Sequence, residues 1–177
     1  MTPPTLTGTR VRLRAHQAAD WDAVTALWAH PDVVRYISGV PSSSTDSWGR
    51  ILRYRGLWLL LGYGYWAVED LSTGQYIGDV GFADFKRQTE PVYHGIAEAG
   101  WALHPAVHGK GYAGEALSLA LGWARDHIPP SPEFGGVSVV AIIADANEAS
   151  VRLAERVGFT KRQMLKMGAE EGPLYGW

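Results

Sequence analysis

The sequence has no cysteine among its 177 residues. It can therefore form no disulfide bond, and it has no thiolate that could ligate a metal or attack a substrate. No apolar run reaches the roughly 18 residues that a membrane span needs, and residues 1–14 contain no apolar core of a signal peptide. These absences predict a cytoplasmic protein without a membrane partner.

An excess of charge of one sign is also missing. The 16 basic and 18 acidic residues give a formal net charge of −2, so the composition indicates no basic surface for nucleic acid. The length suits one domain, and a hydrophobic content of 46% is enough for a core. We therefore expect a single domain over residues 1–177, either a monomer or a homodimer, with no nucleic-acid partner.

The most informative stretch is a glycine-rich turn, Gly109-Lys110-Gly111-Tyr112-Ala113-Gly114. A strand-like run, residues 95–103, comes before it. After it, apolar residues recur at the spacing of one stripe on a helix. The stripe consists of Ala113, Ala116, Leu117, Ala120, Leu121 and Ala124. The predicted order is therefore strand, glycine loop and helix.

This order is typical of an anion-binding site. The N–H groups in the first turn of a helix lack intrahelical partners, and the helix dipole adds partial positive charge there. Glycines let a ligand come close to the backbone because they carry no Cβ. A ligand with a phosphate or pyrophosphate group is therefore the first hypothesis.

Other interpretations of the loop compete with this one. The phosphate-binding loop of nucleoside triphosphatases needs Gly-Lys-Ser/Thr at its end, whereas Tyr112 follows Gly111 here. The glycines at 109, 111 and 114 do match Gly-x-Gly-x-x-Gly, but the nearest acid after a strand, Asp145, lies farther on than a dinucleotide site requires. The hypothesis of a nicotinamide-binding oxidoreductase is thus supported by these three glycines alone. A plain surface turn before an ordinary helix is the remaining alternative.

Further motifs follow one another along the chain: Glu98-Ala-Gly-Trp-Ala-Leu-His-Pro, His108-Gly-Lys-Gly-Tyr-Ala-Gly-Glu-Ala, Asn147-Glu-Ala-Ser150 and Arg156-Val-Gly-Phe159. Together they resemble the GNAT superfamily of acyl-CoA-dependent N-acetyltransferases, in particular the Rim-type ribosomal-protein N-terminal acetyltransferases. The resemblance covers almost the whole chain. It departs from the family at His108, where Gln or Arg is usual.

The resemblance implies acetyl-CoA as co-substrate and no metal. In the family, the loop amides hold the pyrophosphate of coenzyme A, and backbone groups of the preceding strand hold the pantetheine and the acetyl carbonyl. The resemblance implies that the residues that bind the cofactor in this chain are Trp101, Ala102, Leu103, His108, Gly109, Lys110, Gly111, Tyr112, Ala113, Gly114 and Asn147. The alternative role of Asn147 is to cap the helix that follows it.

Two residues are candidates for proton transfer. The family often places a glutamate on the strand before the loop, so Glu98 is the candidate base. Desolvation at the mouth of an apolar cleft would suit that role, while an ordinary ion-paired glutamate is the alternative. Ser150 is the candidate proton donor to the thiolate, with a backbone-bonded helix-start serine as the alternative. Many relatives use a tyrosine seven residues after the asparagine, where Ala154 stands here.

The rest of the chain predicts an α/β (α+β) fold. Strands are expected early and late, with helices near residues 20–28, 45–61 and 147–157 and a buried strand at residues 137–144. The crossover from residues 95–103 to 137–144 makes these two strands parallel if they are adjacent. The resemblance implies a mostly antiparallel central sheet, flanked by helices, in which this parallel pair splays apart.

The remaining polar residues carry weaker hypotheses. His104 and His108 lack a third partner, so no metal site is predicted. Asp79 lies beside Gly78 and is expected at a turn end or on the surface. The acceptor is an amine, either a protein or peptide N-terminus or a small molecule. A non-catalytic acyl-CoA sensor is the alternative from another class, because it would keep the loop without the acid and the base.

Overall fold

The structure is a computed structural model that describes residues 2–168 and 170–177. Contacts within the chain divide it into two compact units. The first comprises Met1–Gly81 and Trp101–Ala120, and the second comprises Phe82–Gly100 and Leu121–Trp177. Two strands and one helix each contribute residues to both units.

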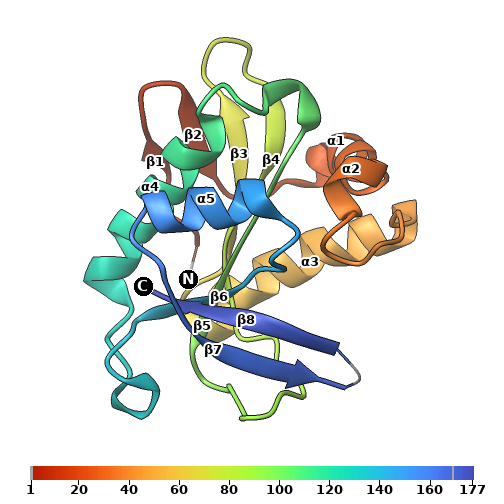
Figure 1. Ribbon diagram of the computed structural model, residues 1–177. Helices are drawn as coiled ribbons and strands as arrows, with labels where there is room; N and C mark the ends of the chain where they lie inside the picture. Colours follow the sequence, from red (N-terminus) through yellow and green to blue (C-terminus); the bar gives the residue numbers. More distant parts are fainter. Residues whose placement is uncertain (1, 169) are drawn as a thin grey trace. The chain divides into compact units, whose positions relative to one another are not determined.

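The first unit begins with two short strands, continues with helices and ends its first segment in a hairpin. In Figure 1, its first four strands lie side by side, and the register makes every neighbouring pair antiparallel. Its elements are β1 (Leu6–Thr7), β2 (Val11–Arg14), η1 (Ala18–Asp20), α1 (Trp21–Trp28), α2 (Pro31–Val34), α3 (Ser44–Leu61), β3 (Tyr65–Asp70) and most of β4 (Tyr76–Ala83). The second segment adds the end of β5 (Ala97–Leu103), η2 (Pro105–Val107) and the start of α4 (Tyr112–His127).

Helix α3 begins at a capping box. Ser43 accepts the N–H of Asp46, and the Asp46 carboxylate accepts the N–H of Ser43 in return. The sequence placed the start of this helix near residue 45, and the structure places it at Ser44. The helix ends at Gly62, whose φ of 75° is left-handed and therefore favours glycine.

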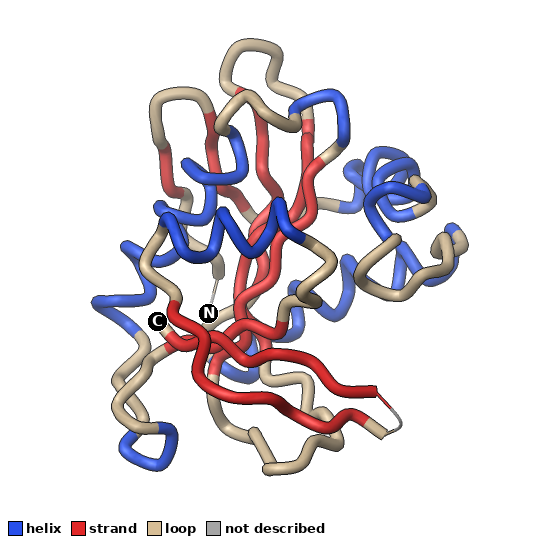
Figure 2. Tube along the Cα trace, viewed as in Figure 1, coloured by secondary structure: helices blue, strands red, loops and turns tan. Residues whose placement is uncertain are grey.

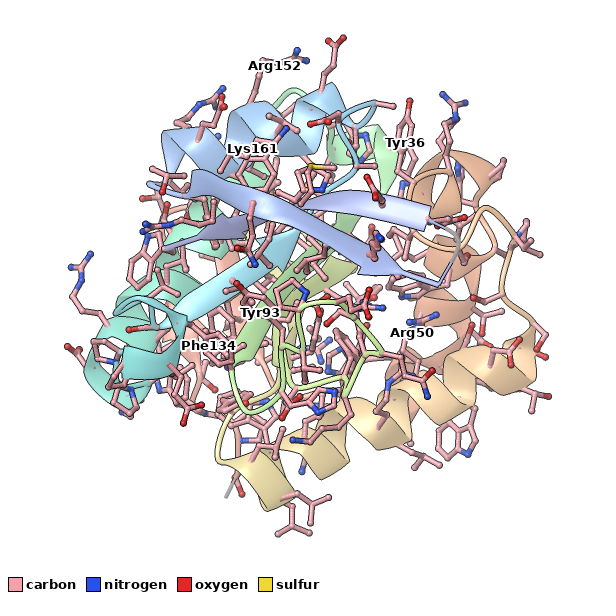
Figure 3. The ribbon with its side chains drawn as sticks, turned by 60° about the horizontal axis from the view of Figure 1, so that its bottom comes forward. Tyr36, Arg50, Tyr93, Phe134, Arg152 and Lys161 are labelled. Atoms are coloured by element: carbon pink, nitrogen blue, oxygen red, sulfur yellow. The ribbon has the colours of Figure 1, made fainter. Side chains whose placement is uncertain are left out.

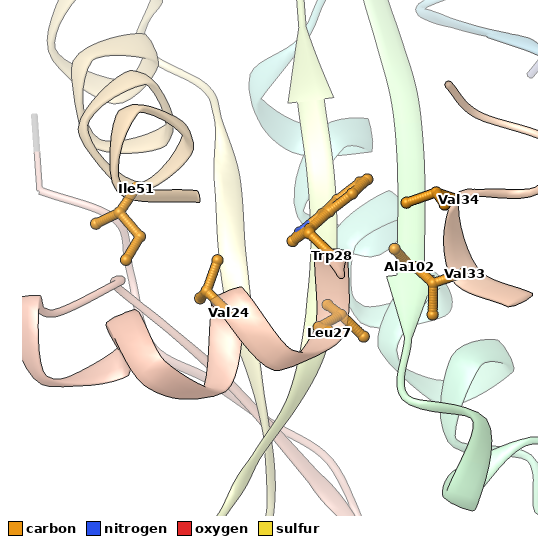
Figure 4. Packing of buried hydrophobic residues seen from close by; sticks show 7 residues of the cluster. All are labelled: Val24, Leu27, Trp28, Val33, Val34, Ile51 and Ala102. Atoms are coloured by element: carbon orange, nitrogen blue, oxygen red, sulfur yellow. The ribbon is translucent and has the colours of Figure 1, made fainter. Parts of the chain in front are cut away.

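The core of the first unit forms where α1, α2 and α3 meet the end of β5. Trp28, at the end of α1, lies between the side chains of its neighbours in Figure 4. The buried cluster consists of Val24, Leu27, Trp28, Val33, Val34, Ile51 and Ala102. Burial of such side chains contributes about 1.5–3 kcal/mol each to the free energy of unfolding. The cluster fixes the end of β5 within this unit.

The second unit contains a parallel strand pair and a long hairpin. Strand order is β5-β6-β8-β7, and the register pairs Ala97 with Val139 and Glu98 with Val140 in parallel. The hairpin of β7 and β8 stands out in Figure 2. The elements are the start of β5, the end of α4, η3 (Pro132–Phe134), β6 (Val139–Ile142), α5 (Glu148–Arg156), β7 (Thr160–Met167) and β8 (Glu170–Gly176).

The predicted fold class is confirmed. The described residues form helices and a mostly antiparallel set of eight strands with one parallel pair, β5 with β6. The apolar stripe of α4 is buried as expected, except for the half-buried Ala113. The late strands that the sequence predicts are β7 and β8, and β8 runs from Glu170 to Gly176. None of the helices in the part of the chain that the structure describes is both long and apolar enough to span a bilayer.

Candidate active site

The glycine loop lies in the first unit, directly before α4. Gly109 and Gly111 have φ values of 72° and 83°, in the left-handed region that other residues rarely adopt. A Cβ at Gly111 would stand 3.0 Å from the Arg10 guanidinium nitrogens. Helix α4 starts at Tyr112, so the amides of its first turn have no carbonyl four residues earlier within the helix. The predicted strand, loop and helix order is confirmed.

Arg10 holds this loop through its side chain. Its Nη1 donates to the carbonyl oxygen of Lys110 at 2.6 Å, and its Nε donates to Glu115 Oε2 at 2.8 Å. The backbone N–H of Arg10 donates to Glu115 Oε1 at 2.7 Å. Burial alone would raise the pKa of Glu115, but the bonds from Arg10, together with those from the backbone N–H groups of Val11 and Thr9, outweigh burial and lower it. Arg10 thus binds both the Lys110 carbonyl of the loop and the Glu115 carboxylate in the first turn of the helix. Its positive charge offsets the negative charge of Glu115 at the helix start.

The ring of His108 connects the loop to the end of β5. Its Nε2 lies 2.8 Å from the carbonyl oxygen of Leu103, and because a carbonyl only accepts, Nε2 carries the proton there. Tyr112 donates its hydroxyl to Asp70 Oδ2 at 3.1 Å. Both side chains therefore serve to position the loop.

Glu98 lies on β5 in the second unit and is paired with Arg87. The guanidinium Nε and Nη2 donate to Glu98 Oε2 and Oε1 at 2.8 and 2.9 Å. This bidentate geometry engages both carboxylate oxygens. The side chain of Glu98 is 14% exposed and that of Arg87 is 44% exposed. Glu98 is therefore an ion-paired glutamate, which was the alternative considered from the sequence. If Glu98 acts as a base, it does so in the presence of the Arg87 guanidinium.

Asn147 and Ser150 stand at the start of α5, also in the second unit. Asn147 is the N-cap, and its Oδ1 accepts the N–H of Ser150 at 3.3 Å. The expected capping role of Asn147 is confirmed. Ser150 is half-buried in the first turn of the helix.

Asp79, on β4 of the first unit, corrects a prediction. The sequence placed it at a turn end or on the surface, but its side chain is fully buried. It accepts bonds from His16 Nε2 at 2.7 Å, from the Tyr76 hydroxyl at 2.8 Å and from Trp28 Nε1 at 2.8 Å. Burial, followed by the charge of Asp79, raises the pKa of Tyr76 well above its usual value. Alternation along a strand cannot reveal such a site, because its partners come from distant segments.

The structure brings the predicted site residues into two groups. Trp101, Ala102, Leu103 and the loop residues 108–114 belong to the first unit, and Glu98, Asn147 and Ser150 belong to the second. Sequence reasoning gave no role to Arg10, Glu115 or Arg87. Glu115 follows the glycines directly and could have been noticed, whereas no local pattern marks either arginine. Among the described residues, no group of three or more His, Asp or Glu side chains could hold a metal ion.

Comparisons with known proteins agree with this geometry. The sequence model of the acetyltransferase (GNAT) domain matches residues 10–160. YkkB of Bacillus subtilis is 29% identical over 153 residues, covering 84% of this chain and 81% of that protein. A GNAT-family acetyltransferase from Bordetella pertussis superimposes with a TM-score of 0.80 at 26% identity, covering 97% of each chain.

A more distant structure is similar in fold. It is RimL, a ribosomal L7/L12 alpha-N-protein acetyltransferase in complex with coenzyme A, which has a TM-score of 0.75 at 16% identity. The alignment covers 98% of this chain and 97% of RimL.

Proposed function

Because this chain belongs to the acetyltransferase (GNAT) family, whose members use acetyl-CoA, we propose that it moves the acetyl group directly to a primary amine while both substrates are bound. The observation that carries the proposal is the glycine loop at the start of α4, held by Arg10 through Lys110 and Glu115. A helix start with left-handed glycines is suited to the pyrophosphate of coenzyme A.

The cofactor would lie along the loop and the end of β5. The loop amides would hold the pyrophosphate, and backbone groups of the strand would hold the pantetheine and the acetyl carbonyl. Asn147 would add a hydrogen bond to the pantetheine beyond its capping role. The residues assigned to the cofactor are Trp101, Ala102, Leu103, His108, Gly109, Lys110, Gly111, Tyr112, Ala113, Gly114 and Asn147.

The reaction needs no enzyme nucleophile. The amine nitrogen attacks the thioester carbonyl carbon, a C–N bond forms, and the C–S bond breaks to release the coenzyme A thiolate. Glu98 takes the proton that the amine loses. Ser150 passes a proton to the thiolate and regains one from solvent water in the same step. Backbone donors at the carbonyl oxygen stabilise the tetrahedral intermediate.

The acceptor we propose is the N-terminal amine of a protein or peptide. Its support is the set of motifs shared with the Rim-type branch, together with the fold likeness to RimL, a protein N-terminal acetyltransferase by name. A small-molecule amine is the second candidate. An open cavity of about 450 Å³ beside Arg87 and Lys166 favours it, since small ligands occupy cavities of roughly 300–1,000 Å³.

Thermal unfolding with and without acetyl-CoA tests the cofactor, with NADH as the parallel control. A ligand at about 100 times its dissociation constant adds roughly 2.7 kcal/mol to the free energy of unfolding. For a chain of this size, this raises the Tm by about 5–10 °C. A rise with NADH alone, or with neither compound, would contradict the loop assignment. Acetyl transfer is then followed by thiol release, to which a cysteine-free protein contributes no background.

A matched pair of variants tests the loop itself. Gly111→Glu should abolish the response to acetyl-CoA, because it puts bulk and negative charge at the pyrophosphate site and strains a left-handed residue. Gly122→Glu makes the same change on an exposed turn of α4 with open space around it, and should leave the response intact. Unchanged affinity in Gly111→Glu would overturn the assignment.

A further inference from the structure

The ion pair between Arg87 and Glu98 obstructs the chemistry proposed for Glu98. Both carboxylate oxygens accept guanidinium N–H groups at 2.8 and 2.9 Å. An amine can pass a proton to Glu98 only if it comes within hydrogen-bonding distance of one of these oxygens. Arg87 already uses one acceptor site on each of them.

The cavity next to Glu98 offers little room for a substrate. The cavity that Arg87 and Glu98 line measures about 10 Å³, which is close to the minimum for one water. Its apolar wall belongs to the core of the second unit, which includes Ile96, Val140 and Leu174. Tyr93 lines the cavity as well, and its ring stacks on Phe134 with centroids 4.7 Å apart. Both residues are labelled in Figure 3. Because this wall is packed, Arg87 is the group that has to move.

Arg87 also lines a second, open cavity of about 450 Å³. The ionisable groups that line this cavity besides Arg87 are Lys166, His94 and Glu90. Glu90 is the one carboxylate on this lining, and Glu98, the partner of Arg87, lines the other cavity. An anion that enters here therefore meets Lys166 and competes with Glu98 for the Arg87 guanidinium. The side chain of Arg87 is 44% exposed and its ring contact, Phe85, is apolar with the guanidinium 4.7 Å from the centroid. The arginine is the more exposed member of the pair, so a carboxylate from solvent can reach its guanidinium.

We propose that the acceptor carries a carboxylate near its amine and that this carboxylate takes Arg87 from Glu98. The guanidinium already holds one carboxylate in bidentate geometry, so a second carboxylate can replace Glu98 with the same pattern of bonds. Arg87 is then the residue that selects the acceptor, and its release leaves Glu98 able to accept the amine proton. This inference rests on the proposed function, because it takes Glu98 as the proton acceptor.

Binding of a dicarboxylate tests the site without any turnover. Glutarate at ten times its dissociation constant should raise the Tm of the wild-type protein by about 3–6 °C and should leave that of Arg87→Gln unchanged. Arg152→Gln is the matched control, since Arg152 also pairs with a glutamate but projects away from α5 into solvent in Figure 3. It should respond as the wild type does. No response in the wild type, or an equal response in Arg87→Gln, would overturn the proposal.

Paired acceptors test the selection. Each pair differs only in the carboxylate: an amino acid against its carboxamide, and an Ala-Glu peptide against an Ala-Gln peptide. In the wild type, kcat/KM should favour the acidic member at least tenfold, and Arg87→Gln should remove this preference while accelerating transfer to the neutral member. A ratio near one in the wild type, or an unchanged ratio in the variant, would overturn the proposal.

The two measurements separate this inference from the proposed function. Glutarate binding that depends on Arg87, without transfer to any amine, supports the carboxylate site and counts against the proposed function alone. Acetyl transfer without any Arg87-dependent response to glutarate supports the proposed function and overturns the inference.

Discussion

Asp79 and Glu98 are strand carboxylates with opposite surroundings. Asp79 is fully buried and accepts bonds from His16, Tyr76 and Trp28. His16 and Trp28 are themselves buried. Glu98 receives its two bonds from a single arginine, whose side chain is 44% exposed.

The difference separates a structural carboxylate from one that is available for chemistry. The partners of Asp79 are held by packing, so it cannot change them without opening the core. The partner of Glu98 lies on the segment between β4 and β5, and its side chain is 44% exposed. A carboxylate that exchanges partners at low cost is the one that can enter a reaction.

The largest effect on stability is expected at Asp79. Asp79→Ala should lower the free energy of unfolding by about 3–5 kcal/mol, because it leaves several buried donors without an acceptor. Urea unfolding followed by tryptophan fluorescence measures the change. Asp145→Ala, which removes an exposed ion pair with Lys161, is the control and should cost about 0–1 kcal/mol. A loss below about 1 kcal/mol for Asp79→Ala would erase the distinction between the two carboxylates.

Glu98 should show the reverse behaviour. Glu98→Gln should lower kcat about 10²–10⁴-fold, because the amide cannot take a proton, and should leave the affinity for acetyl-CoA unchanged. Its free energy of unfolding should fall by no more than about 1 kcal/mol. Thiol-release kinetics over a range of pH, with Ser150→Ala measured in parallel, provide the test. Glu148→Gln, on the exposed face of α5, is the control.

Two results of the Glu98→Gln experiment would contradict the distinction between Asp79 and Glu98. Wild-type rates at every pH would remove Glu98 from the mechanism. Absence of turnover in the wild type itself, with acetyl-CoA bound, would favour the acyl-CoA sensor.

Local patterns predicted the elements of this fold but not the pairing of its charges. The stripe that begins at Ala113, the capping role of Asn147 and the glycine turn all depend on neighbours within a few residues, and all are confirmed. The bonds of Arg10 join residues about 100 positions apart, and those of Asp79 to Trp28 span 51 positions. No periodicity in the sequence encodes such distances.

The candidate site divides in the same way. The loop could be located because its chemistry needs glycines, which a sequence displays directly. The ion pairing of Glu98 could not be predicted, because it depends on Arg87, eleven residues earlier in the chain. An ion pair between a strand residue and a residue of the preceding segment leaves no pattern in the sequence. The strand position of Glu98 was predictable, while its availability to a substrate was not.

A third group of carboxylates, Asp20 and Glu69 around Arg14, extends the comparison of Asp79 with Glu98. The quantity to measure here is how stability changes as the pH falls, and this is the smallest effect that we expect. Arg14 donates to Asp20 Oδ1 and Oδ2 at 2.8 and 2.9 Å and to Glu69 Oε2 at 2.6 Å. Its charge is permanent like that of Arg87, but its side chain is only 16% exposed. Burial alone would raise the pKa values of Asp20 and Glu69. Arg14, together with the Gln17 backbone N–H at Asp20 and with Arg12 at Glu69, outweighs burial and lowers both pKa values.

A carboxyl group with a lowered pKa in the folded state stabilises the protein above its unfolded pKa, which is about 3.9 for Asp and about 4.3 for Glu. This contribution should be complete at pH 7 and should disappear as the pH falls below about 5 through the lowered pKa values. Arg14→Gln should therefore be less stable than the wild type at pH 7, and the difference should narrow toward pH 3. Urea unfolding of both proteins at several pH values measures it, with Arg152→Gln as the exposed control. If the difference in free energy of unfolding between Arg14→Gln and the wild type stays constant with pH, Arg14 acts through packing rather than through its charge. Asp20 and Glu69 would then be structural carboxylates like Asp79.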